Sequence, residues 1–252
     1  MRRTARSRYW RTLASAGCLL LFGCASTHTD PAHGPPAASS RVPSDGRPLH
    51  HADAGAGLRI PGLGPATQAQ IGPETQQAFV VTGKAGSDTA TAVLYTRKHP
   101  AGWQRTAGPW RARNAVLGWT GAHRSGDLRT PIGVFRIGDA GGLLPNPGTR
   151  LPYDQDEEFD EPGVGYYGES LAGSFDHVVA IDYNRRSGVS PLDKVRPLGL
   201  EKGGGVWIHV DHGGPTKGCI ALPRPQMSQL LRHLDPQQRP VIAMGPAAEL
   251  RR

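Results

Sequence analysis

Short apolar runs separated by glycine and proline constrain the fold of this chain more than any other feature. Seven runs are rich in β-branched or aromatic residues and are bounded by turn-forming residues, which is typical of short strands. The expected strands are 77–82, 92–97, 114–120, 133–137, 177–182, 206–211 and 240–244. Only residues 224–234 have helical spacing, with their apolar side chains on one face. We therefore predict a mainly β domain, an antiparallel β-sandwich or partly closed barrel with one or two short helices.

Composition limits where that domain begins. Residues 23–78 contain no Phe, Trp or Tyr, and residues 25–70 consist largely of small residues, polar residues and proline. Such a segment buries too little apolar surface to offset the entropy lost on ordering, so we expect a disordered tether over 25–70. Residues 71–247 have the size of one domain, and 248–252 form a short tail.

The N-terminus has the features of an export signal. Five arginines precede an apolar run over residues 13–22, which is shorter than the roughly 20 residues of a membrane-spanning helix. We predict a signal peptide over residues 1–24. Leu21-Phe22-Gly23-Cys24 resembles a lipobox, which favours a lipoprotein with its lipid on Cys24 over a plainly secreted protein. The expected location is the cell envelope, either anchored to the membrane or released to the periplasm or cell wall.

The net charge gives no reason to expect a nucleic-acid partner. The whole chain carries a formal charge of +8. The segment expected to be removed holds five arginines and no acidic residue, so the remainder carries +3. This mild excess is far from the strongly basic balance of nucleic-acid-binding domains.

Cysteine usage directs attention to one residue. Cys18 and Cys24 lie in the predicted export signal, and Cys219 stands alone in the predicted domain. Exported domains commonly use cysteines in pairs, as disulfides. A lone thiol in an oxidising compartment is either buried and inert or retained for its chemistry.

The strand before Cys219 supports a chemical role. Alternation along 206–211 puts Val206, Ile208 and Val210 on a core face. Trp207, His209 and Asp211 then point the other way. A histidine there is placed to line a cleft.

A glycine-rich reversal, Gly213-Gly214-Pro215, can bring Cys219 back beside His209, ten residues earlier. The imidazole could take the thiol proton and form a nucleophilic ion pair. The backbone N–H groups of Gly218 and Cys219 could donate to a developing oxyanion, because Gly218 has no side chain to obstruct a carbonyl. Nucleophile, base and oxyanion donors thus fit within one short segment.

These residues resemble the active-site motif of the L,D-transpeptidases, the YkuD-like enzymes that cross-link peptidoglycan. Their pattern is a histidine on a strand, a loop, then Ser or Thr, a variable residue, Gly, Cys and an aliphatic residue; here it is His209 followed by Thr216-Lys217-Gly218-Cys219-Ile220. Thr130-Pro131-Ile132-Gly133-Val134-Phe135 looks like the family's TPxGxF strand. Ile181-Asp182-Tyr183-Asn184 and Ala221-Leu222-Pro223 are similar to one branch of the family.

The resemblance implies that Cys219 attacks the carbonyl after the third residue of a peptidoglycan stem tetrapeptide and forms a thioester. His209 would act as general base and acid, and no metal or organic cofactor is implied. The candidate substrate-binding residues are Thr216, Trp207, Tyr183, Asn184 and His212. The expected partners are peptidoglycan stem peptides, and the membrane through the N-terminal lipid.

This chain also departs from the family pattern. Lys217 stands where many members have a second histidine, and Ala221 stands where Arg or Asn is usual. These departures leave open an L,D-carboxypeptidase or exchange activity on the same acyl-enzyme, or a non-catalytic envelope-binding module. The group that orients His209 also stays open: Asp182, His177 or a backbone carbonyl.

A zinc hydrolase is the less favoured alternative. His209, Asp211, His212 and Cys219 are all zinc-ligand types. Strand alternation, however, predicts that His212 lies away from the face that holds His209 and Asp211.

Overall fold

The computed structural model describes residues 58–252. The predicted signal peptide, Cys24 and the first part of the predicted tether lie outside the described residues. None of the helices in the described part is long and apolar enough to cross a membrane.

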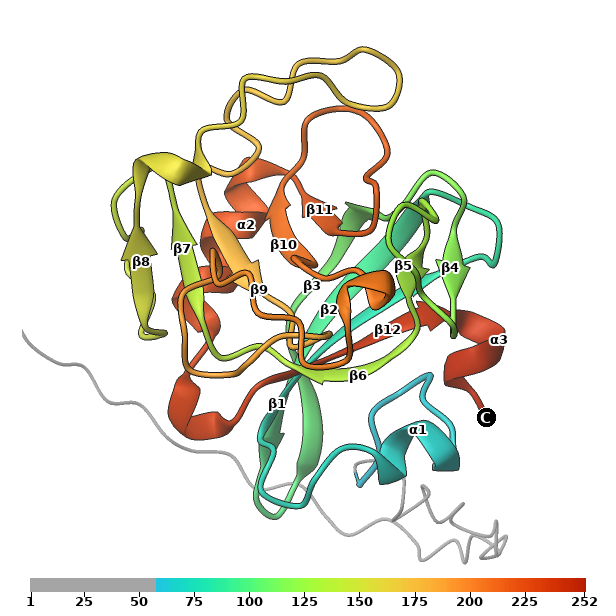
Figure 1. Cartoon of the computed structure of the whole chain (residues 1–252). Helices are drawn as coiled ribbons and strands as arrows, with labels where there is room; N and C mark the ends of the chain where they lie inside the picture. The colour runs from blue at the N-terminus through green and yellow to red at the C-terminus, as the bar shows by residue number, and fades with distance from the viewer. Residues whose placement is uncertain (1–57) are drawn as a thin grey trace, which may run out of the picture. The chain divides into compact units, whose positions relative to one another are not determined.

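One curled ten-stranded sheet forms the body of the domain, in the order β6-β12-β1-β2-β3-β11-β10-β9-β7-β8 (Figure 1). Its strands are β1 Gln77–Gly83, β2 Thr89–Lys98, β3 Gly102–Arg113, β6 Gly133–Arg136, β7 Ala140–Gly142, β8 Tyr153–Gln155, β9 Val178–Ala180, β10 Trp207–Val210, β11 Ile220–Leu222 and β12 Val241–Pro246. The pairs β1–β12, β10–β11 and β7–β8 are parallel, and the other neighbours are antiparallel. A separate parallel pair joins β4 Trp119–Thr120 to β5 Thr130–Pro131. The predicted mainly β, partly closed architecture is confirmed.

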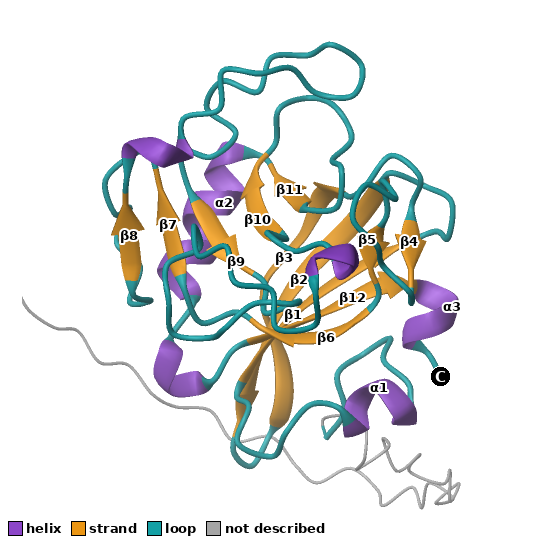
Figure 2. Ribbon diagram, viewed as in Figure 1, coloured by secondary structure: helices purple, strands orange, loops and turns teal. Residues whose placement is uncertain are grey.

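Three short α-helices accompany the sheet: α1 Pro65–Ala69, α2 Arg224–His233 and α3 Ala247–Leu250 (Figure 2). Single 3-10 turns are η1 Glu157–Phe159, η2 Leu200–Lys202 and η3 Pro236–Gln238. The helix predicted from apolar spacing is α2. It buries Met227, Leu230 and Leu231 in the main core, against apolar residues of the sheet.

The strand predicted over 114–120 is wrong except at its end, where residues 119–120 form β4. The long strand there is β3, which ends at Arg113, and the chain then turns through Gly118 at φ +77°. Polar and charged residues occupy most of the exposed positions of β3, so the strand lacks the apolar run that marks its neighbours. β7, β8 and β11, each three residues long, also escaped prediction, whereas the equally short β9 was predicted because it lies in the apolar run 178–181.

The tether predicted over 25–70 does not hold for its described end. Ile60 and Leu63 are buried in a second apolar cluster with Val241 and Leu250. The Gly64 N–H donates to the Leu250 carbonyl at 2.8 Å, so this segment packs against α3. Ile60 and Leu63 thus anchor the end of this otherwise polar segment to the domain. The predicted tail, 248–252, belongs to the same cluster through Leu250.

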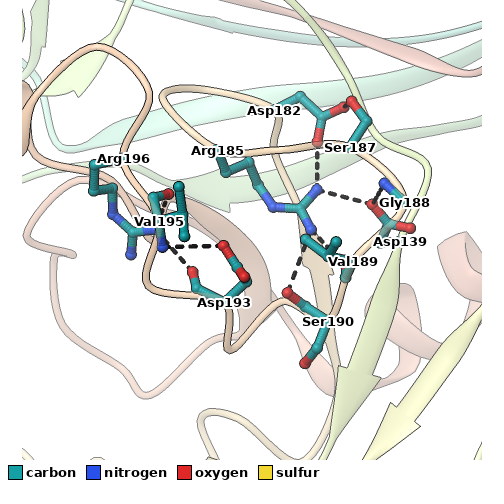
Figure 3. A network of polar contacts seen from close by, with 10 residues as sticks. All are labelled: Asp139, Asp182, Arg185, Ser187, Gly188, Val189, Ser190, Asp193, Val195 and Arg196. Carbon is teal, nitrogen blue, oxygen red and sulfur yellow. Dashed lines mark hydrogen bonds and ion pairs between the residues drawn. The ribbon is translucent and has the colours of Figure 1, made fainter.

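A buried ion network fixes the long connection between β9 and β10 (Figure 3). The Arg185 Nη1 group donates to Asp139 Oδ2 at 2.8 Å and to Asp182 Oδ1 at 2.5 Å, and all three side chains are under one tenth exposed. Its Nη2 group donates to the Val189 carbonyl at 2.7 Å. Because a buried charge is tolerated only when paired and hydrogen-bonded, this network holds the loop in one path. The same connection ends in residues 203–205, which line a cavity with Cys219; its Sγ lies 3.7 Å from the Gly205 carbonyl oxygen.

Candidate active site

Two neighbouring parallel strands position the predicted catalytic residues. β10 carries His209. The loop that follows β10 leads to β11, and Cys219 is the last residue before β11 (Figure 1). The register pairs Ile208 with Ile220 and His209 with Ala221. The Trp207 N–H lies 3.4 Å from Cys219 Sγ, which places the thiol beside β10. The reversal predicted from the sequence therefore brings the two residues together.

His209 and Cys219 line one cavity of about 110 Å³. Its wall also includes Gly165, Tyr166, Leu171, Phe175, His212, Pro215, Thr216 and Lys217. The predicted residues His212 and Thr216 thus belong to the same site. The 163–171 segment, between η1 and β9, forms one side of it.

A backbone carbonyl orients His209. His209 is 3% exposed, and its Nδ1 lies 2.8 Å from the Val210 carbonyl oxygen. A carbonyl can only accept, so Nδ1 carries the hydrogen and Nε2 is the proton acceptor. The other two candidates are engaged elsewhere: Asp182 pairs with Arg185, and His177 Nδ1 lies 3.0 Å from the Tyr153 hydroxyl.

Burial favours the neutral forms of both His209 and Cys219. It lowers the pKa of His209 to about 4, against the opposing effect of the Val210 carbonyl. It raises the pKa of Cys219 to about 11, although the Trp207 N–H favours the thiolate. Burial therefore disfavours the ion pair expected from the sequence, because a poorly solvated site penalises both charges. The imidazole of His209 is therefore neutral at physiological pH, with Nε2 able to accept a proton.

Thr216 braces the cysteine loop. Its hydroxyl donates to the Cys219 carbonyl at 2.7 Å and accepts from the Gly218 N–H at 3.3 Å. The side chain is buried, and both bonds fix the backbone next to the thiol. The Gly218 N–H, expected as an oxyanion donor, is thus held by a long bond to Thr216 in the free protein.

His212 stacks on His209, contrary to the expectation from strand alternation. The two rings are 5.7 Å apart and 9° from parallel. β10 ends at Val210, so the alternation does not extend to His212. Asp211 turns away to Arg113, with Nε and Oδ1 3.3 Å apart, so it does not line the cavity.

Glu169 contacts His212 without lining the cavity, and it was not predicted. Its Oε1 lies 3.2 Å from His212 Nδ1. Its own N–H, the Tyr167 N–H and His212 hold the pKa of the Glu169 carboxyl below its ordinary value, against some desolvation. Glu169 is 43 positions from His212, so nothing in the local sequence could have indicated the contact.

Three predicted substrate-binding residues lie outside the cavity walls. The Trp207 ring packs between Phe159 and Phe175, with centroids 5.7 and 5.2 Å away. The Tyr183 hydroxyl donates to the Lys202 carbonyl at 3.0 Å, and Asn184 Nδ2 donates to the Gly199 and Gly203 carbonyls at 2.9 and 2.6 Å. Tyr183 and Asn184 fasten the β9–β10 connection, because buried backbone carbonyls there need donors.

A second cavity, of about 170 Å³, also reaches Cys219. Lys217, Gly218 and Gly203–Gly205 line it together with His123, which sequence analysis missed. His123 comes from the loop between β4 and β5, and its neighbours in the sequence form no recognisable motif. Within residues 58–252, no three His, Cys, Asp or Glu side chains form a group that could hold a metal ion.

Comparison with protein-family models finds one match, the YkuD model, described as the L,D-transpeptidase catalytic domain. It spans residues 72–242, about two thirds of the chain. No curated protein and no solved structure matches the sequence.

Proposed function

Because the chain belongs to the YkuD family of L,D-transpeptidase catalytic domains, we propose that it transfers acyl groups between peptidoglycan stem peptides through a thioester on Cys219. The observation that carries this proposal is the shared cavity of Cys219 and His209, in which Nδ1 of the imidazole is fixed by Val210 and Nε2 is left as the base. A nucleophile and a base oriented by a third group are the parts that covalent acyl transfer requires.

In the first half-reaction His209 first accepts a proton and then donates it. Cys219 Sγ bonds to the carbonyl carbon after the third stem residue, and its proton passes to His209 Nε2. The tetrahedral intermediate then collapses, and the same proton goes to the departing amine of the terminal D-amino acid. A His209 that is neutral before attack can accept this proton without first releasing one.

The loop before β11 supplies the oxyanion donors. The N–H groups of Gly218 and Cys219 would stabilise the negative oxygen of the intermediate. The Gly218 N–H would exchange its 3.3 Å hydrogen bond to the Thr216 hydroxyl for one to the negatively charged oxygen of the intermediate, which is the stronger acceptor. The hydroxyl of Thr216 meanwhile keeps its bond to the Cys219 carbonyl, which holds the loop in place.

The acceptor in the second half-reaction distinguishes the remaining activities. An amine of a second stem gives a cross-link, a free D-amino acid gives exchange, and water gives L,D-carboxypeptidation. We propose transpeptidation as the main activity, with exchange and hydrolysis of the same thioester as alternatives. A non-catalytic binding module and a zinc hydrolase remain as outcomes of the test.

The test is product analysis by liquid chromatography and mass spectrometry. The protein, wild type or Cys219→Ala, is incubated with purified tetrapeptide muropeptides, with and without a metal chelator. Chelator-resistant dimers that require Cys219 support the proposal. Shortened stems alone would indicate a carboxypeptidase, and chelator-sensitive products would indicate a zinc hydrolase. If wild type yields nothing, the binding module is favoured.

We also propose that residues 1–24 direct export and that Cys24 carries the lipid anchor. The basic start, the short apolar run and the small residues before Cys24 support this. Cell fractionation tests it, since Cys24→Ala should move the protein from the membrane to the soluble envelope fraction. An unchanged distribution would refute lipidation at Cys24.

A further inference from the structure

The large sheet opens between two of its neighbouring strands, β3 and β11. These strands share one registered pair, Ala221 with Arg113, whereas β2 and β3 pair along most of their length. Continued by two residues, the register would pair Arg111 with Pro223, and proline has no N–H to support such a ladder. A cavity of about 490 Å³ lies there, which we call the β3 groove. Its walls are Thr89, Ala90, Arg111, Ala112, Arg113, Asp211 and Pro223.

Two arginines of β3 lie on the face of the sheet that carries His209. The register pairs His209 with Ala221 and Ala221 with Arg113, and residues opposite one another in a ladder share a face. Arg111 lies two residues before Arg113 in the same strand, so it lies on that face as well. Both arginines therefore line the β3 groove on the side of the sheet where the candidate active site lies.

Arg113 is oriented by a carboxylate that is itself anchored. Its Nε lies 3.3 Å from Asp211 Oδ1, and the Gly213 N–H donates to the same oxygen at 2.9 Å. A guanidinium group held through Nε has its two terminal nitrogens left for other acceptors. Within residues 58–252 these two nitrogens of Arg113 donate no hydrogen bond. The side chain thus presents a fixed fork of donors to the groove.

Arg111 adds a cation without a partner. Its side chain is exposed, and no acidic side chain in the described part of the chain forms an ion pair with it. The groove therefore holds two guanidinium groups against one carboxylate, that of Asp211. An adjoining cavity of about 380 Å³ shares Thr89 with the groove and contains Lys84, which adds another positive charge. This balance favours an anionic ligand.

The β3 groove adjoins the cavity of the candidate active site. Asp211 lines the groove, and the next residue, His212, lines the cavity that contains Cys219. With strands about 4.8 Å apart and about 3.3 Å per residue, the backbone of Arg113 lies about 8 Å from that of Cys219, and the backbone of Arg111 about 14 Å. An extended peptide covers these distances in roughly two to four residues. A stem peptide held at Cys219 therefore reaches the groove.

We propose that the β3 groove binds an internal carboxylate of the stem peptide, one that is not its chain terminus, through Arg113 and Arg111. This inference rests on the proposed function and adds a specificity to it: stems with free internal carboxylates are preferred to stems in which these groups are amidated. A guanidinium group matches the two oxygens of a carboxylate with two parallel N–H···O bonds. An amide lacks the negative charge and turns an NH2 group toward donors.

A purely structural role of Arg113 makes a different prediction. Through Asp211, Arg113 also braces the loop that follows β10. A brace of this kind does not touch the ligand, so its loss would weaken the binding of every stem by the same factor. A preference for the free carboxylate that disappears with the arginines is therefore a readout that a brace would not move.

The experiment measures binding without turnover, by isothermal titration calorimetry. The Cys219→Ala protein is titrated with two tetrapeptide muropeptides that differ only in their internal carboxylates, which are free in one and amidated in the other. The comparison is repeated with Arg113→Gln, Arg113→Lys and Arg111→Gln in the same background. Arg105→Gln is the matched control, because Arg105 is an exposed arginine of β3 that lines neither the groove nor the cavities that contain Cys219.

The free stem should bind about 10-fold or more tightly than the amidated stem, which is the size expected of a hydrogen bond to a charged group. Arg113→Gln and Arg111→Gln should each reduce this preference. Arg113→Lys should recover only part of it, because lysine is a point charge without the fork. Arg105→Gln should keep the full preference. If Arg113→Gln is not folded by circular dichroism, Arg111→Gln decides the matter, since its exposed side chain forms no ion pair in residues 58–252.

Equal affinity of the Cys219→Ala protein for the two stems would overturn the inference. So would an Arg113→Gln variant that weakens the binding of both stems alike, because Arg113 would then act on the loop and not on the ligand. Product analysis of wild type with the same stems separates this failure from that of the proposed function. Products formed from both stems at equal rates refute only the role of the groove, whereas no product from either stem removes the proposed function as well.

Discussion

The buried Arg185 network should contribute far more to stability than the adjacent ion pair of Arg186. Arg185 is 2% exposed and contacts two carboxylates, on Asp139 and Asp182, that are 6% and 8% exposed. Arg186 is 54% exposed and pairs with Asp193 at 2.8 Å. The two arginines are adjacent in the same loop, so each serves as a control for the other.

Replacing Arg185 by Met keeps much of the side-chain volume and removes the charge. Two buried carboxylates then lose their cation, and breaking a buried pair in this way costs about 3–5 kcal/mol. The carbonyl of Val189 also loses its donor. Arg186→Met should cost about 0–1 kcal/mol, because an exposed pair is screened by water. For a domain of this size, 1 kcal/mol corresponds to roughly 2–4 °C in Tm.

Urea denaturation and thermal melts of the two variants measure the difference directly. We expect Arg185→Met to lower Tm by about 10 °C and Arg186→Met to lower it by about 2 °C or less. Adding Asp182→Asn to Arg185→Met should recover part of the loss, since one stranded carboxylate is neutralised. Equal effects of the two arginine variants would refute the reasoning that burial determines the cost.

Three further predictions concern the site. Because burial raises the pKa of Cys219 to about 11, the folded protein should react with iodoacetamide at pH 7.5 roughly 100-fold more slowly than the guanidine-unfolded protein. The alkylation rate of Cys219, followed by peptide mapping, should still rise near pH 10. A rate that reaches a plateau below pH 8 would instead indicate an ion pair. In Thr216→Val the Cys219 carbonyl and the Gly218 N–H lose their partner, so the free energy of unfolding should fall by about 1–3 kcal/mol in urea denaturation and most of the acylation rate should be lost. Thr216→Ser keeps the hydroxyl and should retain both the stability and the acylation rate. Burial holds the pKa of His209 at about 4, below its ordinary 6.5, so the unfolded chain binds a proton in this window and the folded chain does not. The contribution of His209 to the free energy of unfolding is therefore present above pH 6.5 and falls by about 2 kcal/mol between pH 7.5 and 5. In His209→Gln the free energy of unfolding should lose this part of its pH dependence. Identical pH profiles of unfolding free energy for wild type and His209→Gln would contradict the prediction.

Sequence patterns sufficed where a feature was local. The apolar stripe of 224–234 predicted α2, and the resemblance of the segment around Cys219 to the L,D-transpeptidases is confirmed by the family match. The reversal after β10 also followed from its glycines, because Gly213 adopts φ +89°. Each of these features depends on residues within about ten positions of one another.

Features that depend on distant contacts were missed. Glu169 and His123 reach the site from separate loops, and no local pattern marks them. His212 was assigned to the wrong side, because alternation was extended past Val210, where β10 ends. Tyr183 and Asn184 were expected in the cleft, yet their polar atoms satisfy buried carbonyls of the β9–β10 connection. These two side chains are used to donate hydrogen bonds to backbone carbonyls, and not for the substrate-binding role that the resemblance suggested.

Burial also determined the protonation state, which spacing alone could not predict. A cysteine and a histidine that share a cavity suggest an ion pair when solvation is ignored. His209 is buried and Cys219 is only partly exposed, so the neutral forms are favoured at rest.

The most direct test of the central claim is the intact mass of the protein after mixing with a tetrapeptide muropeptide. Wild type, Cys219→Ala and His209→Gln are quenched in acid over a time course, and the modified residue is located by peptide mapping. The account predicts a stem-acyl adduct on Cys219 in wild type, none in Cys219→Ala, and much slower formation in His209→Gln. An adduct on another residue, or equally fast acylation without His209, would contradict it.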